Sequence, residues 1–160
     1  MPVYRTASEE QTIALGERLA REFPAGAVVL LIGGLGAGKT TLAKGIITGL
    51  GAAVPEEVSS PTFTLIHEYG EGPLVYHIDL YRLDRIEEIA DLGLDDYLYG
   101  HGLTVIEWAE KGLEILPAGH LQVKIDYSND NERTFKFIPH GKRYEGLLEK
   151  LASLINPVIS

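Results

Sequence analysis

The chain has 160 residues, of which 45% are hydrophobic and 23% charged, and this length and composition fit one globular domain over residues 1–160. The absence of cysteine excludes a disulfide framework and a thiolate metal site. The N-terminus lacks the apolar core of a signal peptide, and no apolar run approaches the roughly 20 residues that span a bilayer, so we expect a cytoplasmic protein without a membrane segment. The formal net charge of −9, with 14 scattered basic residues, argues against an extended nucleic-acid interface on this chain.

The first predicted elements are a helix, a strand and a second helix. Ser8 and Gln11 have the spacing of a capping box, which predicts a helix start ahead of apolar residues four apart. Residues 27–32 are continuously apolar and rich in β-branched side chains, which predicts a strand buried on both faces of a parallel sheet. A helix is predicted over residues 41–47, and Gly49 is expected to end it.

Between this strand and this helix, residues 33–40 have the sequence GGLGAGKT, which fits the phosphate-binding pattern GxxxxGK[ST] at every fixed position. Glycines let bare backbone N–H groups approach a phosphate at the start of a helix, whose dipole adds to the attraction. Lys39 is expected to reach the β- and γ-phosphates, and the Thr40 hydroxyl to hold Mg²⁺. The loop residues expected to bind the nucleotide are Gly34, Leu35, Gly36, Ala37 and Gly38. The sequence therefore predicts a nucleoside triphosphate site.

The middle of the chain is predicted to contain a loop, a hairpin and short helices. In the proline-bearing loop, Ser60 and Thr62 lie where switch segments often sense a γ-phosphate, although a simple turn and strand start explains them equally well. Residues 70–73 are expected to form the turn of the hairpin. The strands and helical segments predicted here cover residues 63–69, 74–79 and 86–99.

The last third of the chain is predicted to add three strands and two helices. A short buried strand and a helix that ends at Pro117 are expected first, and then an alternating hairpin at an antiparallel sheet edge and a final helix. The corresponding residues are 103–107, 109–116, 121–127, 134–138 and 144–155. The predicted fold class is a single-domain α/β protein of the P-loop NTPase type, with a mixed, mainly parallel sheet flanked by helices and antiparallel hairpin strands.

Two predicted strands end on acids, Asp79 and Glu107, where parallel sheets collect their ligands. Glu107 follows the more apolar run, which favours it as the Mg²⁺ carboxylate, either directly or through water. Asp79 then orients water or completes the metal shell, while a solvated strand end remains the alternative for each acid. His77 is either an orienting partner near Asp79 or a structural histidine. Trp108 is either packed or marks a partner-facing edge.

Four sequence blocks, in this order, resemble the TsaE family of small bacterial P-loop ATPases of tRNA threonylcarbamoyladenosine biosynthesis: GGLGAGKTTL, SPTFTLIHEY, HIDLYRL and IEWAEK. The resemblance runs from about residue 6 to residue 137. It implies ATP and Mg²⁺ as ligands, catalysis by Lys39, Asp79 and Glu107, and metal binding by Thr40, Glu107 and Asp79. It also implies nucleotide contacts from Thr6, Thr41 and Arg133, and functional coupling of Trp108 to the two acids. Ser60 and Thr62 remain the candidate switch or partner-coupled residues.

The resemblance further implies TsaD and TsaB as partners, with tRNA contacted mainly through their complex, and an ATPase that is slow alone. One departure is that the family often has an acidic residue where this chain has Gly34, which puts any role of that acid in turnover in doubt. Two other classes of P-loop protein are the alternatives. A small-molecule kinase would use Asp79 as its base, but the chain has no arginine-rich lid segment. A GTPase would need the guanine-reading NKxD pattern, which is absent.

Overall fold

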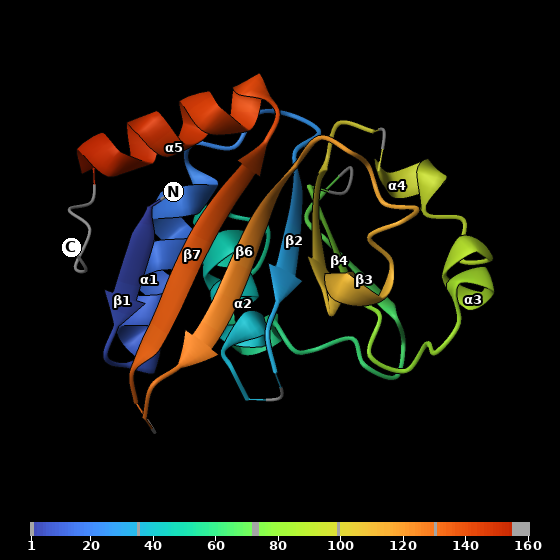
Figure 1. Ribbon diagram of the computed structural model, residues 1–160, viewed down its shortest axis with the longest axis horizontal. Coiled ribbons are helices and arrows are strands. Elements are labelled where there is room, and N and C mark those ends of the chain that lie inside the picture. The colour runs from blue at the N-terminus through green and yellow to red at the C-terminus, as the bar shows by residue number, and fades with distance from the viewer. Residues whose placement is uncertain (1, 35, 72–73, 99, 130, 155–160) are drawn as a thin grey trace.

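The computed structural model describes residues 2–34, 36–71, 74–98, 100–129 and 131–154, and within them seven strands form one mixed sheet (Figure 1). The strands are β1 (Val3–Thr6), β2 (Val28–Ile32), β3 (Ile66–Tyr69), β4 (Val75–Asp79), β5 (Leu103–Glu107), β6 (His120–Tyr127) and β7 (Arg133–His140). The α-helices are α1 (Glu9–Ala20), α2 (Lys39–Gly49), α3 (Ile86–Ala90), α4 (Asp95–Leu98) and α5 (Lys142–Leu154). Two 3₁₀ turns, η1 (Pro55–Glu57) and η2 (Ala109–Lys111), complete the described elements.

The strand order is β1-β7-β6-β2-β5-β4-β3. The four central strands, β6, β2, β5 and β4, are parallel to one another, while β3 and the β7–β1 pair are antiparallel to their neighbours. Val28, Val29, Leu30 and Leu31 of β2 are all buried, which confirms the strand predicted to be covered on both faces. The fold class expected from the sequence is confirmed.

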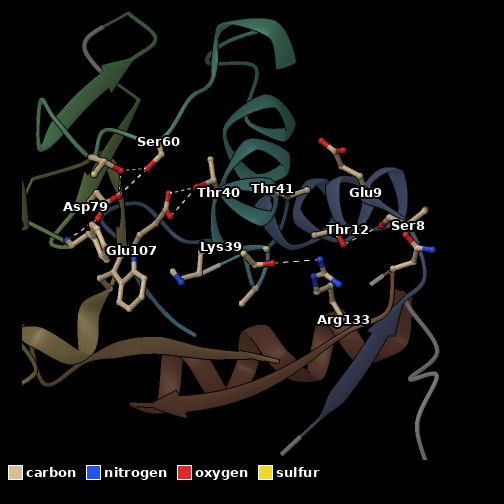
Figure 2. Close-up of a pocket in the computed structure, with 17 residues that line it drawn as sticks. Ser8, Glu9, Thr12, Lys39, Thr40, Thr41, Ser60, Asp79, Glu107 and Arg133 are labelled. Atoms are coloured by element: carbon tan, nitrogen blue, oxygen red, sulfur yellow. Dashed lines mark hydrogen bonds between the residues drawn. The ribbon is translucent and has the colours of Figure 1, made fainter. Parts of the chain in front are cut away.

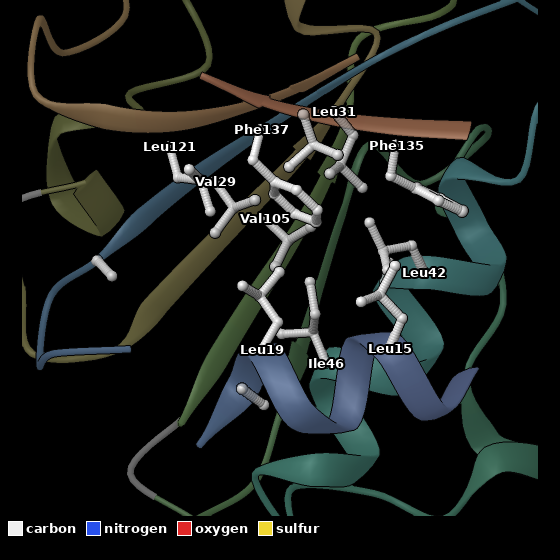
Figure 3. Close-up of a cluster of buried hydrophobic side chains, with 14 of the residues drawn as sticks. Leu15, Leu19, Val29, Leu31, Leu42, Ile46, Val105, Leu121, Phe135 and Phe137 are labelled. Atoms are coloured by element: carbon white, nitrogen blue, oxygen red, sulfur yellow. The ribbon is translucent and has the colours of Figure 1, made fainter. Parts of the chain in front are cut away.

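Side chains that alternate along β2 supply two separate cores. Val29 and Leu31 face the core beneath α1, α2 and α5, where Figure 3 shows leucines and isoleucines of α1 and α2 meeting the phenylalanines of β7. Val28 and Leu30 face the opposite core, which is closed by α3, α4 and the η2 segment. The first helix begins as its capping box predicts, because the Ser8 hydroxyl accepts a hydrogen bond from the Gln11 N–H at 3.1 Å.

Glycines allow α1 and α2 to pack closely against each other and so fix the start of α2 relative to α1. A Cβ added at Gly45 would overlap the Ile13 carbonyl oxygen, and one added at Gly16 would lie 2.6 Å from the Leu42 carbonyl oxygen. Both contacts are with backbone, which cannot move aside as a side chain can.

We therefore expect Gly45→Ala to lower the free energy of unfolding by about 1–3 kcal/mol or more, since overpacking forces backbone shifts. Thermal unfolding measures this as a decrease in melting temperature of roughly 2–4 °C per kcal/mol for a chain of this size. Gly146→Ala on α5 is the matched control, because nothing lies within 4 Å of a Cβ at that position. Equal melting temperatures for the two variants would contradict the proposed helix contact.

Three local expectations are wrong. The helix predicted over residues 109–116 is only the short η2 turn, because Trp108 adopts a left-handed φ of 58° before it and Gly112 ends it. The β6–β7 hairpin is not at a sheet edge, since β6 pairs with β2 and β7 pairs with β1. The strand predicted from residue 63 begins at Ile66, after Leu65 donates its N–H back to the Pro61 carbonyl at 2.6 Å.

Other predicted segments are confirmed by the structure or include residues outside its described ranges. The hairpin of β3 and β4 is confirmed, although residues 72–73 of its turn lie outside the described residues. Tyr99 and Ile155, where two helical segments are predicted to end, also lie outside them. Among the described helices, none has the length and apolar character needed to cross a bilayer.

Candidate functional site

The carboxyl ends of the central parallel strands and the start of α2 border a cleft of about 610 Å³ (Figure 2). Its described lining comes from six places in the chain: the start of α1, the loop before α2 with the first turn of α2, the loop before β3, the ends of β4 and β5, and the β6–β7 turn. The lining residues are Ser8, Glu9, Thr12, Gly36, Ala37, Gly38, Lys39, Thr40, Thr41, Ser60, Thr62, Asp79, Tyr81, Glu107, Trp108, Asn131 and Arg133.

The glycine loop has the backbone that its sequence predicts. Gly36 and Gly38 have φ values of 76° and 110°, in the left-handed region that a side chain disfavours, and Gly38 is the N-cap of α2. Lys39, Thr40 and Thr41 follow in the first turn of α2 and line the cleft, and the N–H groups of a helix start attract anions. The predicted contact Leu35 lies outside the described residues.

Gly34 is not among the described residues that line the cleft, although its carbonyl oxygen accepts a hydrogen bond from Lys39 Nζ at 2.7 Å. Nothing lies within 4 Å of a Cβ added at Gly34. A larger residue at this position, such as the acid expected from the resemblance, would therefore meet no obstacle at its Cβ.

Lys39 is the buried cation of the cleft, with an exposed fraction of only 5%. Its ammonium group donates to the carbonyl oxygens of Gly33 and Gly34 and lies 4.0 Å from the centroid of the Trp108 ring. Burial lowers the pKa of Lys39, and the negative charges of Glu107, Glu110 and Asp79 act in the opposite direction. The ammonium group is thus surrounded by acceptors and an aromatic face that a phosphate could replace or join.

The two strand-end acids lie side by side, because β4 and β5 are parallel and place Asp79 opposite Glu107 in register. The carboxylate of Glu107 accepts hydrogen bonds from Thr40 Oγ1 at 2.9 and 3.1 Å, and His77 Nε2 lies 2.6 Å from its Oε2. Figure 2 shows the Glu107 carboxylate directed at the first turn of α2. Glu107 is therefore tied to the phosphate-binding loop.

Asp79 is tied instead to the loop that precedes β3. Its Oδ2 accepts hydrogen bonds from the hydroxyls of Ser60 at 2.8 Å and Thr62 at 3.0 Å, and its Oδ1 accepts the Tyr81 N–H at 2.8 Å. The predicted switch residues Ser60 and Thr62 thus meet one acid of the pair. Next to them, Phe63 is 82% exposed, an unusual position for a large aromatic side chain.

The far end of the cleft is built by α1 and the β6–β7 turn. Arg133 extends from β7 to the glycine loop, with Nη2 donating to the Gly36 carbonyl oxygen at 3.4 Å. Thr41 also lines the cleft, but Thr6 is not among the described residues of the lining. The Thr6 hydroxyl lies 2.7 Å from that of Thr12, which does line it.

The sequence analysis does not predict five of the residues that line the cleft as site residues: Ser8, Glu9, Thr12, Tyr81 and Asn131. The capping box at Ser8 predicts where α1 begins. It does not predict that this end of the helix lies at the cleft, because that depends on how distant segments pack. His77 is predicted either as an orienting partner near Asp79 or as a structural histidine, and its described side-chain hydrogen bond is to Glu107.

Across the described residues, no group of three or more His, Cys, Asp or Glu side chains is placed to hold a metal ion alone. Mg²⁺ is commonly held by one or two carboxylates, a hydroxyl, water and substrate phosphates. The Thr40 hydroxyl and the buried Glu107 carboxylate, 2.9 Å apart, form the oxygen pair that such a site needs. The donor set fits Mg²⁺ bound together with a phosphate ligand.

The chain is similar to known proteins over most of its length. Residues 6–135 match the family model described as threonylcarbamoyl adenosine biosynthesis protein TsaE. A Bacillus subtilis (strain 168) relative, named tRNA threonylcarbamoyladenosine biosynthesis protein TsaE, is 45% identical over 150 residues, which cover 93% of this chain and 92% of the relative. A relative of the same name from Nostoc sp. is 41% identical over 138 residues, covering 83% of each chain. The crystal structure of Bacillus subtilis YdiB matches with a TM-score of 0.79 and 40% identity, over 95% of this chain and 94% of that one. The chain therefore belongs to the TsaE family.

Proposed function

We propose that this protein is an Mg²⁺-dependent ATPase that serves the formation of threonylcarbamoyladenosine in tRNA. The observation that carries the proposal is the meeting, at one cleft, of the loop lysine and threonine with two buried strand-end carboxylates. Phosphoryl transfer needs little covalent chemistry from a protein, so a phosphate cradle, a cation and positioned acids are sufficient for hydrolysis.

Each part of the cleft has a distinct task in this proposal. The loop N–H groups and Lys39 bind and orient the β- and γ-phosphates. Thr40 and Glu107 would hold Mg²⁺, with Asp79 able to complete its shell, and a bound ion would supply positive charge beside the phosphate oxygens. Asp79, held by the Ser60 and Thr62 hydroxyls, is positioned to orient the attacking water.

The pathway assignment rests on the relatives, whose names place them in tRNA threonylcarbamoyladenosine biosynthesis. We infer TsaD and TsaB as partners, tRNA contact mainly through their complex, and a cytoplasmic location. A net charge of −9 suits a protein that meets other proteins more than nucleic acid. The exposed Phe63, next to the Ser60–Thr62 loop, gives a partner direct access to a segment hydrogen-bonded to Asp79.

The first experiment is Mg²⁺-dependent ATP hydrolysis by the protein alone and after addition of purified TsaD and TsaB from the same organism. We expect slow turnover alone and at least about a tenfold stimulation by the partners, as when a partner completes the site of other phosphate-hydrolysing proteins. Omission of Mg²⁺ should abolish both rates. Unchanged turnover with the partners present would contradict the pathway assignment and leave only the nucleotide site.

A second candidate function is a P-loop small-molecule kinase. Asp79 favours it, because its carboxylate already accepts two hydroxyl hydrogen bonds, as a base acting on a substrate alcohol would. The test is a screen of metabolites and nucleosides for ADP release. A strong response to one compound, with no response to TsaD and TsaB, would favour the kinase over the ATPase.

A further inference from the structure

A buried histidine stands behind the proposed metal site. His77, on β4, is fully buried, and its Nε2 lies 2.6 Å from Oε2 of Glu107. Its other ring nitrogen, Nδ1, has no hydrogen-bond partner among the described residues. His77 is not one of the described residues that line the cleft, so it can act there only through Glu107.

The chemistry of His77 and Glu107 indicates which of them donates the hydrogen bond. An ionised carboxylate only accepts hydrogen bonds, so Nε2 carries the hydrogen and donates it to Glu107. Nδ1 is then left buried without a hydrogen-bond partner among the described residues, an unfavourable position for a polar atom. A branched apolar side chain would fill the same space without that penalty. Packing alone therefore does not account for histidine at this position.

The geometry shows what the bond achieves. A glutamate side chain at the end of a strand has several rotamers, and each donor that contacts its carboxylate removes some of that freedom. Thr40 donates from α2 and His77 donates from β4, so Glu107 is held from two separate elements. Alternation along β4 places His77 on the same face as Asp79, two residues later.

We propose that His77 is a positioning residue, which holds the Glu107 carboxylate toward Thr40 so that the two can bind Mg²⁺ together. This inference rests on the proposed function, because it concerns the same metal site. A histidine that only filled the core would influence stability and leave the affinity for Mg²⁺ unchanged.

The test compares His77→Leu, which removes the donor, with His77→Gln. The amide nitrogen of glutamine is separated from Cβ by as many bonds as Nε2, so it can donate from the same place. His120→Leu is the matched control, because His120 is also buried, with one ring nitrogen bonded to the Pro117 carbonyl and the other unpartnered among the described residues.

Three quantities are measured: the melting temperature without ligand, the affinity for ADP without Mg²⁺, and the affinity for Mg²⁺ with ADP present. We expect His77→Leu to weaken Mg²⁺ binding by about 10- to 100-fold, with ADP affinity in the absence of Mg²⁺ changed by less than about threefold. His77→Gln should restore most of the Mg²⁺ affinity. His120→Leu should change only the melting temperature.

Wild-type Mg²⁺ affinity in folded His77→Leu would overturn the inference while leaving the proposed ATPase intact, and so would a glutamine variant as impaired as the leucine one. Absence of Mg²⁺-dependent nucleotide binding in the wild-type protein would instead overturn the proposed function itself. If His77→Leu does not fold, His77→Asn replaces it, because its amide is one bond too short to reach Glu107 as Nε2 does.

Discussion

Replacing Lys39 with alanine is expected to lower the rate of ATP hydrolysis by about 100-fold or more. Loss of one preorganised group that stabilises transition-state charge typically has an effect of this size. Lys39 is the buried cation at the start of α2, and its ammonium group is already within hydrogen-bond reach of the loop carbonyls. Alanine has a higher helix propensity than lysine, so the first turn of α2 should persist without it. Steady-state hydrolysis and the melting temperature, measured on the same preparation, separate loss of function from loss of fold.

Lys44→Ala is the control for this variant, because Lys44 belongs to the same helix but not to the described lining of the cleft. The single tryptophan gives a second signal, since Trp108 lies 4.0 Å from the Lys39 ammonium. Nucleotide binding that draws Lys39 toward phosphate should alter the Trp108 fluorescence of the wild-type protein. Normal turnover by Lys39→Ala would break the phosphate assignment, whatever its fluorescence.

Local patterns in the sequence were sufficient for much of the fold. The apolar run before the glycine loop, the capping box at Ser8 and the turn glycines of the β3–β4 hairpin each predict an element that the structure contains. Each of these signals arises from contacts within a few residues or from burial on both faces of a strand. They do not depend on which distant segment becomes a neighbour.

The failures involve distant neighbours. Whether β7 lies at an edge depends on Val3–Thr6, which form a strand that pairs with β7. The sequence predicts a helix over residues 109–116, yet the left-handed Trp108 turns the chain at the end of β5 before a helix can form. Pairing partners and the direction of a loop are set by the assembled core, which outweighs local propensity.

The same distinction applies to the site. The sequence predicted that Asp79 and Glu107 each end a strand, and the parallel register of β4 and β5, which only the structure shows, places them opposite each other. The side chains that hold each acid could not be predicted, because they come from separate parts of the chain. Thr40 and His77 hold Glu107, whereas Ser60 and Thr62 hold Asp79.

These separate environments give the two acids different expected roles. Glu107 is bound to the residue that follows the loop lysine, so a change there acts first on Mg²⁺ and its phosphate ligand. Asp79 is bound to a loop that carries the exposed Phe63, so a change there acts first on loop order and on the nucleophile. The register that makes the acids neighbours does not make them equivalent.

Glu107→Gln is accordingly expected to weaken Mg²⁺ binding and to lower kcat by about 100-fold or more, with ADP affinity in the absence of Mg²⁺ nearly unchanged. The glutamine keeps the shape of the side chain but removes the charge that attracts the ion. Asp79→Asn is expected to lower kcat by about 100-fold while Mg²⁺ affinity stays near the wild-type value, because water orientation is lost and the metal pair is not. Titration of Mg²⁺ against hydrolysis rate and against ADP binding measures both effects.

Glu110→Gln is the charge-matched control for Glu107→Gln and Asp79→Asn. Glu110 is exposed and is not among the described residues that line the cleft, although its negative charge also acts to raise the pKa of Lys39. It removes one negative charge near the site without removing a hydrogen bond to Thr40 or Ser60. If Asp79→Asn abolishes the Mg²⁺ dependence and Glu107→Gln preserves it, the roles of the two acids are reversed. In that case the hydrogen bonds from Ser60 and Thr62 mark the metal ligand, and the Thr40–Glu107 contact serves the fold of α2 and β5.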